Sequence, residues 1–273
     1  MTRMARRTIG MAMLLAAVAA PAAAQYSAPK LKGGATGETY HIQVAGGLWM
    51  SDVLGIIASE QFGIAGSKVD FVKDLKFQKK NVADLRFELR PSRRNKLYAQ
   101  YTPVSFESPS GTTLTREIVF NGQKYAVNAP LTASFDWKVW RLGYELDIIA
   151  LPRGFVGLMF EGRLTDFGAH IKVPGTDEFT RAKGPLPAVG VVARGYLLPN
   201  LSVTASVSGF KVPNISPDYT GNYYDIDLYG TFNLTNNAGV QAGWRSMSTT
   251  VTMKKDFGDM KYKGLWFGGV VRY

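Results

Sequence analysis

Apolar and polar side chains alternate along much of this 273-residue chain. In YYDIDLYGTFNL, every second residue from Tyr224 to Leu234 is apolar or glycine, and the residues between them carry carboxylates, hydroxyls or an amide. A period of two is typical of a β-strand with one apolar face. The same alternation occurs at 85–90, 141–149, 156–165 and 201–208. No convincing amphipathic helix separates these segments, so the pattern predicts an all-β chain.

Turn residues divide the chain into ten predicted strands. We expect strands near 39–50, 83–91, 95–107, 131–149, 153–168, 185–198, 200–212, 222–234, 238–253 and 259–273. Very short turns rich in Pro, Asn and Gly, at 91–95, 151–154, 198–200 and 235–239, alternate with longer connections at about 107–130, 166–184, 212–222 and 254–260. This alternation predicts an antiparallel up-and-down meander. The first 60 residues after the leader are ambiguous, so the count is eight to ten strands.

Three local expectations concern less regular segments. Residues 68–75 resemble a strand, but we assign them to a long first loop because an extra strand would break the even number. Residues 51–63 predict either a short helix over the end of the sheet or a continuation of the first strand. The apolar positions of 131–139 are out of phase with those from Leu142 onward, which predicts a β-bulge near Trp140.

Two architectures place the two sides of these strands differently. In a soluble β-sandwich or lipocalin-like barrel, the apolar side faces inward and the charged side faces water. In a transmembrane barrel, the apolar side faces lipid and the polar side faces the interior. Alternation alone does not distinguish the two.

Three further observations favour the transmembrane barrel. Strands of about ten residues with tight turns on one side match the roughly 9–11 residues that cross a bilayer at a tilt. Aromatic residues near strand ends are expected to form two interfacial girdles; they are Tyr40, Trp49, Tyr101, Trp137, Trp140, Tyr196, Tyr223, Tyr224, Trp244 and Tyr273. The polar faces carry acids and arginines in equal number, as burial inside a narrow barrel requires because an unpaired buried charge is costly.

These charged residues are the predicted lumen charge network. The acids are Asp84, Glu88, Glu145, Asp147, Glu161, Asp225 and Asp227, and the arginines are Arg86, Arg90, Arg141, Arg163, Arg194, Arg245 and Arg272. Arginine suits these positions because its planar guanidinium satisfies several acceptors at once.

The first 24 residues have the parts of a secretory signal. Arg3, Arg6 and Arg7 precede an apolar run from Met11 to Ala20, and small residues at 22–24 predict cleavage near Ala24. We therefore expect a signal peptide at 1–24, a flexible lead rich in glycine at 25–38 and a barrel domain at 39–273. Loss of the three arginines lowers the formal net charge from +11 to +8. No Lys/Arg run or base-stacking motif predicts nucleic-acid binding.

Composition excludes several kinds of chemistry. The chain has no Cys, so it carries no disulfide, no thiolate nucleophile and no lipid-anchored N-terminal Cys. Its two histidines, His41 and His170, lie on different segments, which does not predict a zinc site. We expect no cofactor and no metal.

The chain ends in GLWFGGVVRY, in which Leu265, Phe267, Val271 and Tyr273 share the predicted lipid-facing side. Together with the leader, a last strand that ends on an aromatic resembles the C-terminal signal that barrel assembly machinery reads in bacterial outer-membrane proteins. In pattern, the mature chain is similar to the small barrels of the outer-membrane protein A transmembrane superfamily. The resemblance implies a multi-pass barrel in the outer membrane with both termini in the periplasm. It carries no family-wide catalytic residues.

Three functions remain open on the sequence. The first is a structural or surface-interaction barrel, not an enzyme, whose partners are outer-membrane lipid and lipopolysaccharide; loop lysines that could contact lipopolysaccharide phosphates are Lys68, Lys73, Lys76, Lys79, Lys80, Lys172, Lys183, Lys254, Lys255, Lys261 and Lys263. The second is a narrow porin-like channel for small solutes. The third is a lipid A-modifying enzyme with His170 near Asp166 and Asp177, although no His-x-Ser pair is present. The pattern predicts no ligand and no oligomeric state.

Overall fold

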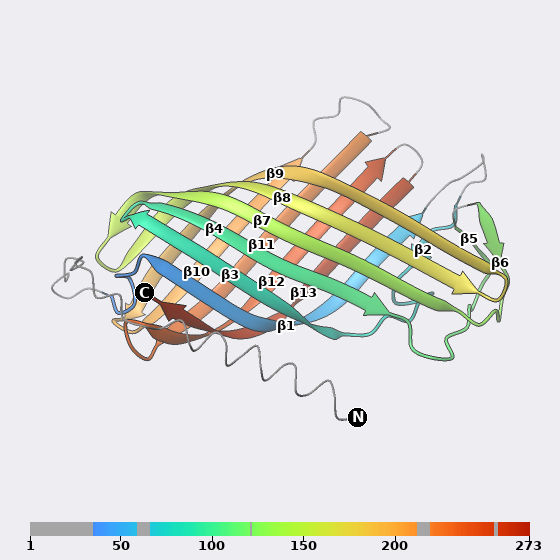
Figure 1. Ribbon diagram of the computed structural model, residues 1–273, viewed down its shortest axis with the longest axis horizontal. Helices are drawn as coiled ribbons and strands as arrows, with labels where there is room; N and C mark the ends of the chain where they lie inside the picture. The colour runs from blue at the N-terminus through green and yellow to red at the C-terminus, as the bar shows by residue number, and fades with distance from the viewer. Residues whose placement is uncertain (1–34, 59–65, 121, 212–218, 254–255) are drawn as a thin grey trace. The chain divides into compact units, whose positions relative to one another are not determined.

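The structure is a computed structural model that describes residues 35–58, 66–120, 122–211, 219–253 and 256–273 (Figure 1). The predicted signal and residues 25–34 of the predicted lead lie outside the described residues. The strands are β1 (Ile42–Ala58), β2 (Val69–Asp70), β3 (Lys80–Ser92), β4 (Asn95–Glu107), β5 (Ile118–Phe120), β6 (Gln123–Tyr125), β7 (Thr132–Leu151), β8 (Gly154–Val173), β9 (Thr176–Leu198), β10 (Leu201–Lys211), β11 (Tyr219–Asn233), β12 (Ala238–Met253) and β13 (Asp256–Arg272). In the described part of the chain, no helix has the length and apolar character needed to cross a membrane.

Ten of these strands form a closed antiparallel ring (Figure 1). Around the ring the order is β1, β3, β4, β7, β8, β9, β10, β11, β12 and β13, and β13 pairs with β1 from Gln43 opposite Arg272 to Ala58 opposite Phe257. Neighbours in the ring therefore follow one another along the chain. The predicted fold class, an antiparallel up-and-down barrel, is confirmed, and the structure decides for ten strands rather than eight.

The two ends of the ring differ. At one end, called here the turn end, residues 93–94, 152–153, 199–200 and 234–237 join consecutive strands. At the other end, called here the loop end, the described residues 66–79, 108–120 and 122–131 belong to long connections that include β2, β5 and β6. The predicted long connection at 166–184 is wrong, because β8 and β9 continue through it to a hairpin at 174–175, where Gly175 has a φ of 84°. The polar side chains of residues 166–184 therefore lie on strands that extend past the apolar part of the barrel's outer surface.

The structure decides the expectations for residues 51–58 and 68–75. β1 continues to Ala58, so residues 51–58 extend the strand and are not a helix. The strand-like segment 68–75 lies in the connection between β1 and β3, and only Val69 and Asp70 of it pair, with Ile57 and Ile56 of β1. The remainder of the 51–63 segment, from residue 59, lies outside the described residues.

The expected bulge near Trp140 is wrong. β7 keeps one register with β8 from Thr132 to Asp147, and the shift falls between Asp147 and Ile149. Along β7, Trp137 and Arg141 are both buried in the interior, whereas Trp140 is exposed on the outside. The inward side chains of β7 are apolar near the loop end and charged toward the turn end. The type of the inward residues therefore changes along the strand, while the alternation of inward and outward positions stays the same.

The loop end of the ring is filled with apolar side chains, called here the loop-end core. The long connections contribute Val69, Phe71, Leu75, Phe77, Leu114, Ile118, Phe120, Tyr125 and Leu131, which pack on inward side chains of the ring such as Trp137 and Tyr262. The Phe71 ring lies 4.9 Å from that of Phe135 and 5.3 Å from that of Phe77, centroid to centroid. Gly55 of β1 lets Phe71 approach, because a Cβ there would lie 2.6 Å from the Phe71 ring.

The outside of the ring is apolar. Leu48, Leu85, Leu142, Phe160, Leu164, Val191, Leu228, Phe267 and Val271 are all exposed there. A soluble barrel would bury this side of its strands, so the arrangement matches a membrane-spanning barrel.

The predicted aromatic girdles are half wrong. Trp140, Tyr224, Trp244 and Tyr273 are exposed on the outside, and Tyr101 stacks on Trp140 at 4.3 Å. The other aromatics, Tyr40, Trp49, Trp137, Tyr196 and Tyr223, are buried inside. Most of these five side chains donate a hydrogen bond from a hydroxyl or indole N–H to a partner in the interior. The position of an aromatic residue near a strand end does not predict such a partner.

Candidate functional site: the charged interior of the barrel

The structure places the fourteen residues of the predicted lumen charge network inside the ring. All are buried except Arg86, Glu88 and Arg90, which are half-buried. Alternate residues of each strand point into the ring, so the polar residues at these positions project into the same narrow space. Three groups result, one across the middle of the barrel and two nearer the turn end.

The middle group is a continuous series of ion pairs, called here the ion-pair belt. Its members are Asp227, Arg86, Asp84, Arg245, Asp225, Arg163, Glu161 and Arg141. Successive members alternate in charge and come from β3, β7, β8, β11 and β12, so the belt connects walls that are far apart in the ring.

Distances within the belt are those of charge-assisted hydrogen bonds. Arg245 donates to Asp84 at 3.0 Å and to Asp225 at 2.9 Å, which joins β12 to β3 and β11. Arg163 reaches Glu161 at 2.6 Å and Asp225 at 3.1 Å. Arg141 also donates to Glu161. Arg163 has no exposed side-chain surface, so these carboxylates supply what water would otherwise supply.

Uncharged side chains complete the belt. Gln100 and Thr102 each donate to Asp84 at 2.7 Å, and the Trp266 indole donates to Asp227 at 2.9 Å. The Tyr223 hydroxyl accepts from Arg163, whose guanidinium lies 4.1 Å from the Tyr223 ring. These contacts explain why an aromatic residue takes an interior position among charges.

A second group shows a charged residue that the predicted network lacks. Lys96 of β4 is buried and donates to Glu145 at 2.5 Å and to Asp147 at 3.2 Å. Its ammonium lies 3.4 Å from the centre of the Phe155 ring. The sequence carries a signal for this position, because Lys96 alternates with the outward Leu97, but arginine supplies every cation of the predicted network.

The third group closes the turn end of the interior. Glu38 lies before β1 and accepts from Arg194 at 2.8 Å, from Arg90 at 3.2 Å and from the Tyr196 hydroxyl at 2.8 Å. Tyr40 donates to Glu88. These contacts hold residues 36–40 across the turn end of the ring.

Hydrogen bonds to the backbone of residues 36–40 hold the same segment. Thr36 N–H donates to Pro199 O at 2.7 Å, and Asn233 donates to Thr36 O at 2.7 Å. Gly37 has a φ of 83°, and a Cβ there would lie 2.6 Å from the Arg272 guanidinium. Burial alone would raise the pKa of Glu38, but Arg194 and Arg90 lower it to about 2. Glu38 falls in the predicted lead, and its glycine-rich sequence gave no signal of these contacts.

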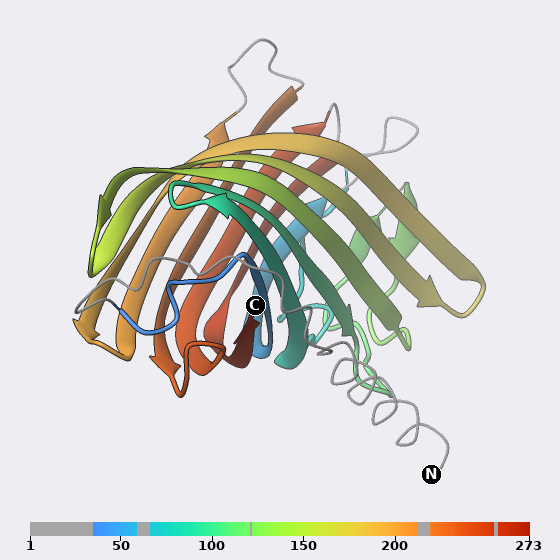
Figure 2. The same cartoon turned by 60° about the vertical axis from the view of Figure 1, so that its left-hand side comes forward.

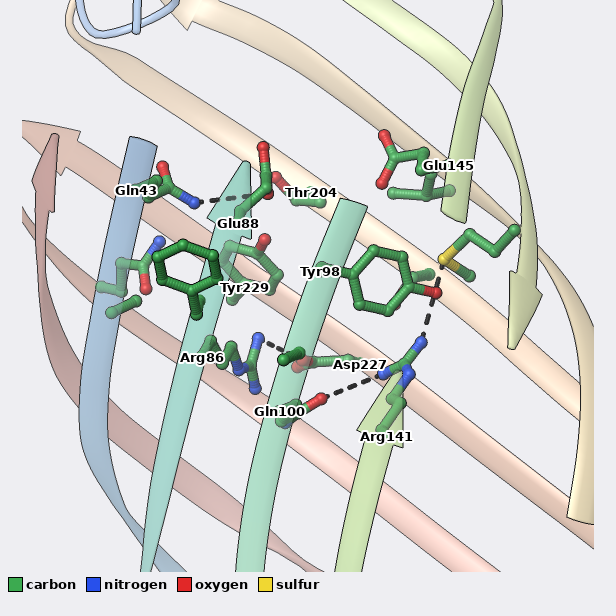
Figure 3. A pocket seen from close by; sticks show the side chains of 17 residues that line it. Gln43, Arg86, Glu88, Tyr98, Gln100, Arg141, Glu145, Thr204, Asp227 and Tyr229 are labelled. Carbon is green, nitrogen blue, oxygen red and sulfur yellow. Dashed lines mark hydrogen bonds and ion pairs between the residues drawn. The ribbon is translucent and has the colours of Figure 1, made fainter. Parts of the chain in front are cut away.

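A small polar cavity lies between the belt and the turn end (Figure 3). Its volume is about 90 Å³, room for about three waters at their liquid volume. Figure 3 shows Arg86, Tyr98, Gln100, Arg141 and Asp227 around it, with polar groups on every side. The cavity therefore lies within the network, and its volume is well below the roughly 300–1,000 Å³ of small-molecule sites.

His170 lies elsewhere, near the loop-end hairpin of β8 and β9. It pairs with Asp177, which also accepts from Lys172 at 3.2 Å. Asp166 pairs instead with Arg181 at 2.5 Å and Lys183 at 3.2 Å. His170 has no hydroxyl hydrogen-bond partner within the described ranges, and those ranges hold no group of His, Asp and Glu placed to bind a metal ion.

The four residues of the predicted assembly signal lie on the outside of β13 and at the chain end. Leu265, Phe267, Val271 and Tyr273 are all exposed, and Trp266 and Arg272 between them are buried. Recognition by assembly machinery stays a prediction.

Known structures share this architecture. No family model and no curated protein matches the chain. The outer membrane protease OmpT from Escherichia coli is similar over 85% of this chain and 97% of that chain, with a TM-score of 0.54 and 10% identity. Ail, the attachment invasion locus protein of Yersinia pestis, covers 86% and 99% with a TM-score of 0.38 and 10% identity. The Pseudomonas putida toluene transporter TodX covers 85% and 90% with a TM-score of 0.34 and 8% identity.

At these identities the likeness concerns the fold alone. The likeness to the outer membrane protease confirms the predicted β-barrel fold, and the outer-membrane location stays a prediction. The role of this barrel has to be argued from its interior and its surface.

Proposed function

We propose that this protein is a closed outer-membrane barrel with a structural or surface-interaction role, and that it is neither a channel nor an enzyme. The observation that carries the proposal is the filling of the interior at three levels. The loop-end core occupies one end, the ion-pair belt crosses the middle, and residues 36–40 cover the turn end.

Each level would have to move before a solute could pass. The loop-end core buries large side chains such as Phe71 and Trp137 almost completely, so its described side chains would obstruct a solute at this end. The belt joins opposite walls through buried ion pairs, and separating any of them leaves an uncompensated charge. The cavity of about 90 Å³ lies between the belt and the turn end.

The loop end supports a surface role. β7, β8 and β9 contain 20, 20 and 23 residues, about twice the 9–11 that cross a bilayer. Beyond Trp140 and Leu164, the outward residues become charged and include Lys138, Asp166 and Arg181. Figure 2 shows this wall as the long green-to-gold strands. Long loops of such barrels face the cell exterior, so this wall would stand above the membrane.

Single-channel recording in a planar bilayer tests the proposal, after heat-dependent gel mobility has shown that the detergent-refolded barrel is intact. We expect a folded, silent barrel under conditions in which a general porin conducts. Discrete and reproducible openings would contradict the proposal and favour the narrow channel.

A further inference from the structure

The wall of the barrel divides between β9 and β10 toward the loop end. β10 pairs with β9 only as far as Gly209 opposite Val189, although β9 begins at Thr176 and stays paired with β8 along that whole length. Within the described residues, β9 therefore has no strand partner on its β10 side from 176 to 188. The ladder ends while the outward side chains are still apolar, as at Val189 and Val207.

Two prolines explain where the ladder ends. Tyr196 N–H donates toward β8, to Arg153 O at 2.9 Å. Alternate residues of a strand direct their N–H groups to the same neighbour, and the β8–β9 register has no shift, so odd-numbered β9 residues face β10. Pro185 and Pro187 are odd-numbered and have no N–H to donate. The sequence itself thus ends the β9–β10 pairing above Val189.

An apolar groove of about 660 Å³ lies where the two strands separate, and we name it the seam groove. Its lining includes Leu158, Phe160, Val189, Val191, Val207 and Tyr224. Gly209 leaves room for the Tyr224 ring, because a Cβ there would lie 2.8 Å from that ring. The volume falls within the roughly 300–1,000 Å³ of small-molecule sites. Because it opens on the apolar outside of the barrel near the loop end, its natural occupant is a hydrocarbon chain of the outer leaflet.

Cations mark the end of the groove that faces the loop end. Lys211, the last residue of β10, lines the groove and is exposed, and no ion pair to it occurs among the described residues. Farther along β9, Arg181 and Lys183 share the single carboxylate of Asp166, which leaves one positive charge in excess. An apolar groove with cations in excess over the described acids at the headgroup level complements a lipid that carries phosphate.

We propose that the seam groove binds an acyl chain of lipopolysaccharide and that Lys211 holds one of its phosphates. The outer-leaflet position argues for lipopolysaccharide over a phospholipid. This site lies on the outer surface of β9 and β10 and does not depend on closure of the interior. A test of lipid binding and a test of conductance can therefore give independent results.

Native mass spectrometry of the full-length refolded barrel in detergent tests the site with added lipid A, phosphatidylglycerol and phosphatidylethanolamine. We expect wild-type protein to retain lipid A in preference to both phospholipids. Lys211→Gln should weaken that retention about five-fold, the effect of one Lys near an anionic headgroup. Val207→Trp, which fills the groove with a larger apolar side chain, should weaken it at least as much.

Two matched variants separate the groove from the general surface. Lys261→Gln removes the same charge from an exposed position on β13, and Val203→Trp adds the same ring to the outside of β10 away from the groove lining. Both should retain lipid A like wild type. Equal retention of the three lipids, or equal losses in the control variants, would show only general lipid coating and would overturn the site. Preference for phosphatidylglycerol would overturn lipopolysaccharide as the occupant.

Discussion

At the scale of single residues, buried charge dominates this interior. Arg163 has no exposed surface and pairs with both Glu161 and Asp225. Removing one partner of a buried pair leaves the others uncompensated, which typically costs about 3–5 kcal/mol. By contrast, an exposed pair such as Arg181 with Asp166 contributes little to stability, because water already solvates both groups.

Arg163→Leu should therefore lower the free energy of unfolding by about 3–5 kcal/mol, because the buried acids Glu161 and Asp225 each lose one of their cationic partners. Urea unfolding of the barrel in lipid vesicles measures the change. Arg181→Leu serves as the matched control and should leave the free energy of unfolding nearly unchanged, because Arg181 is exposed to water. Equal effects of the two variants would argue against a buried belt.

Glu38 gives a pH dependence at the turn end. Its pKa is lowered from 4.5 to about 2, so its contribution to stability is fully present above 4.5 and is lost as the pH falls toward 2. Glu38→Gln should cost up to about 3 kcal/mol at pH 7 and almost nothing at pH 2. Unfolding measured at both pH values tests this, with Glu107→Gln at an exposed position as the control. A difference that stays constant with pH would contradict the role of Glu38.

At the scale of elements, the short turns of the turn end could be predicted well, and the extension of β1, β8 and β9 toward the loop end and the contents of that end could not. Period-two alternation located the ring strands because each has one lipid-facing side. It failed at 131–139, where the interior itself is apolar because the long connections fold inward on it. That packing depends on contacts between segments far apart in the sequence, such as Phe71 with Phe135.

The loop-end core should depend strongly on Phe71. Its ring is fully buried against two other rings, so Phe71→Ala should lower the free energy of unfolding by about 3–5 kcal/mol. Phe160→Ala removes the same ring from the outside of the barrel and should cost much less. Thermal or urea unfolding of both variants in vesicles makes the comparison. A larger loss from Phe160→Ala would mean that the long connections do not pack as a core.

At the scale of the whole molecule, the sequence predicted the class of barrel and the side of each strand that carries the charges. It did not predict which charges pair, because ion pairs such as Arg245 with Asp84 join strands on separate parts of the chain. The sequence also did not predict that the turn end is closed, because this closure depends on a few residues of a glycine-rich segment. The closed interior is thus a property of the assembled ring.

Accessibility of one introduced thiol tests this closure most directly, and the absence of native Cys makes the labelling unambiguous. Thr204 is buried inside the ring and lines the small cavity. In vesicles, Thr204→Cys should resist a small charged thiol reagent from either side and should react once the barrel is unfolded. Lys211→Cys, exposed at the end of β10, should react at once and shows that the reagent is active. Rapid labelling of Thr204→Cys in the folded barrel would show a continuous aqueous path and would contradict the closed interior.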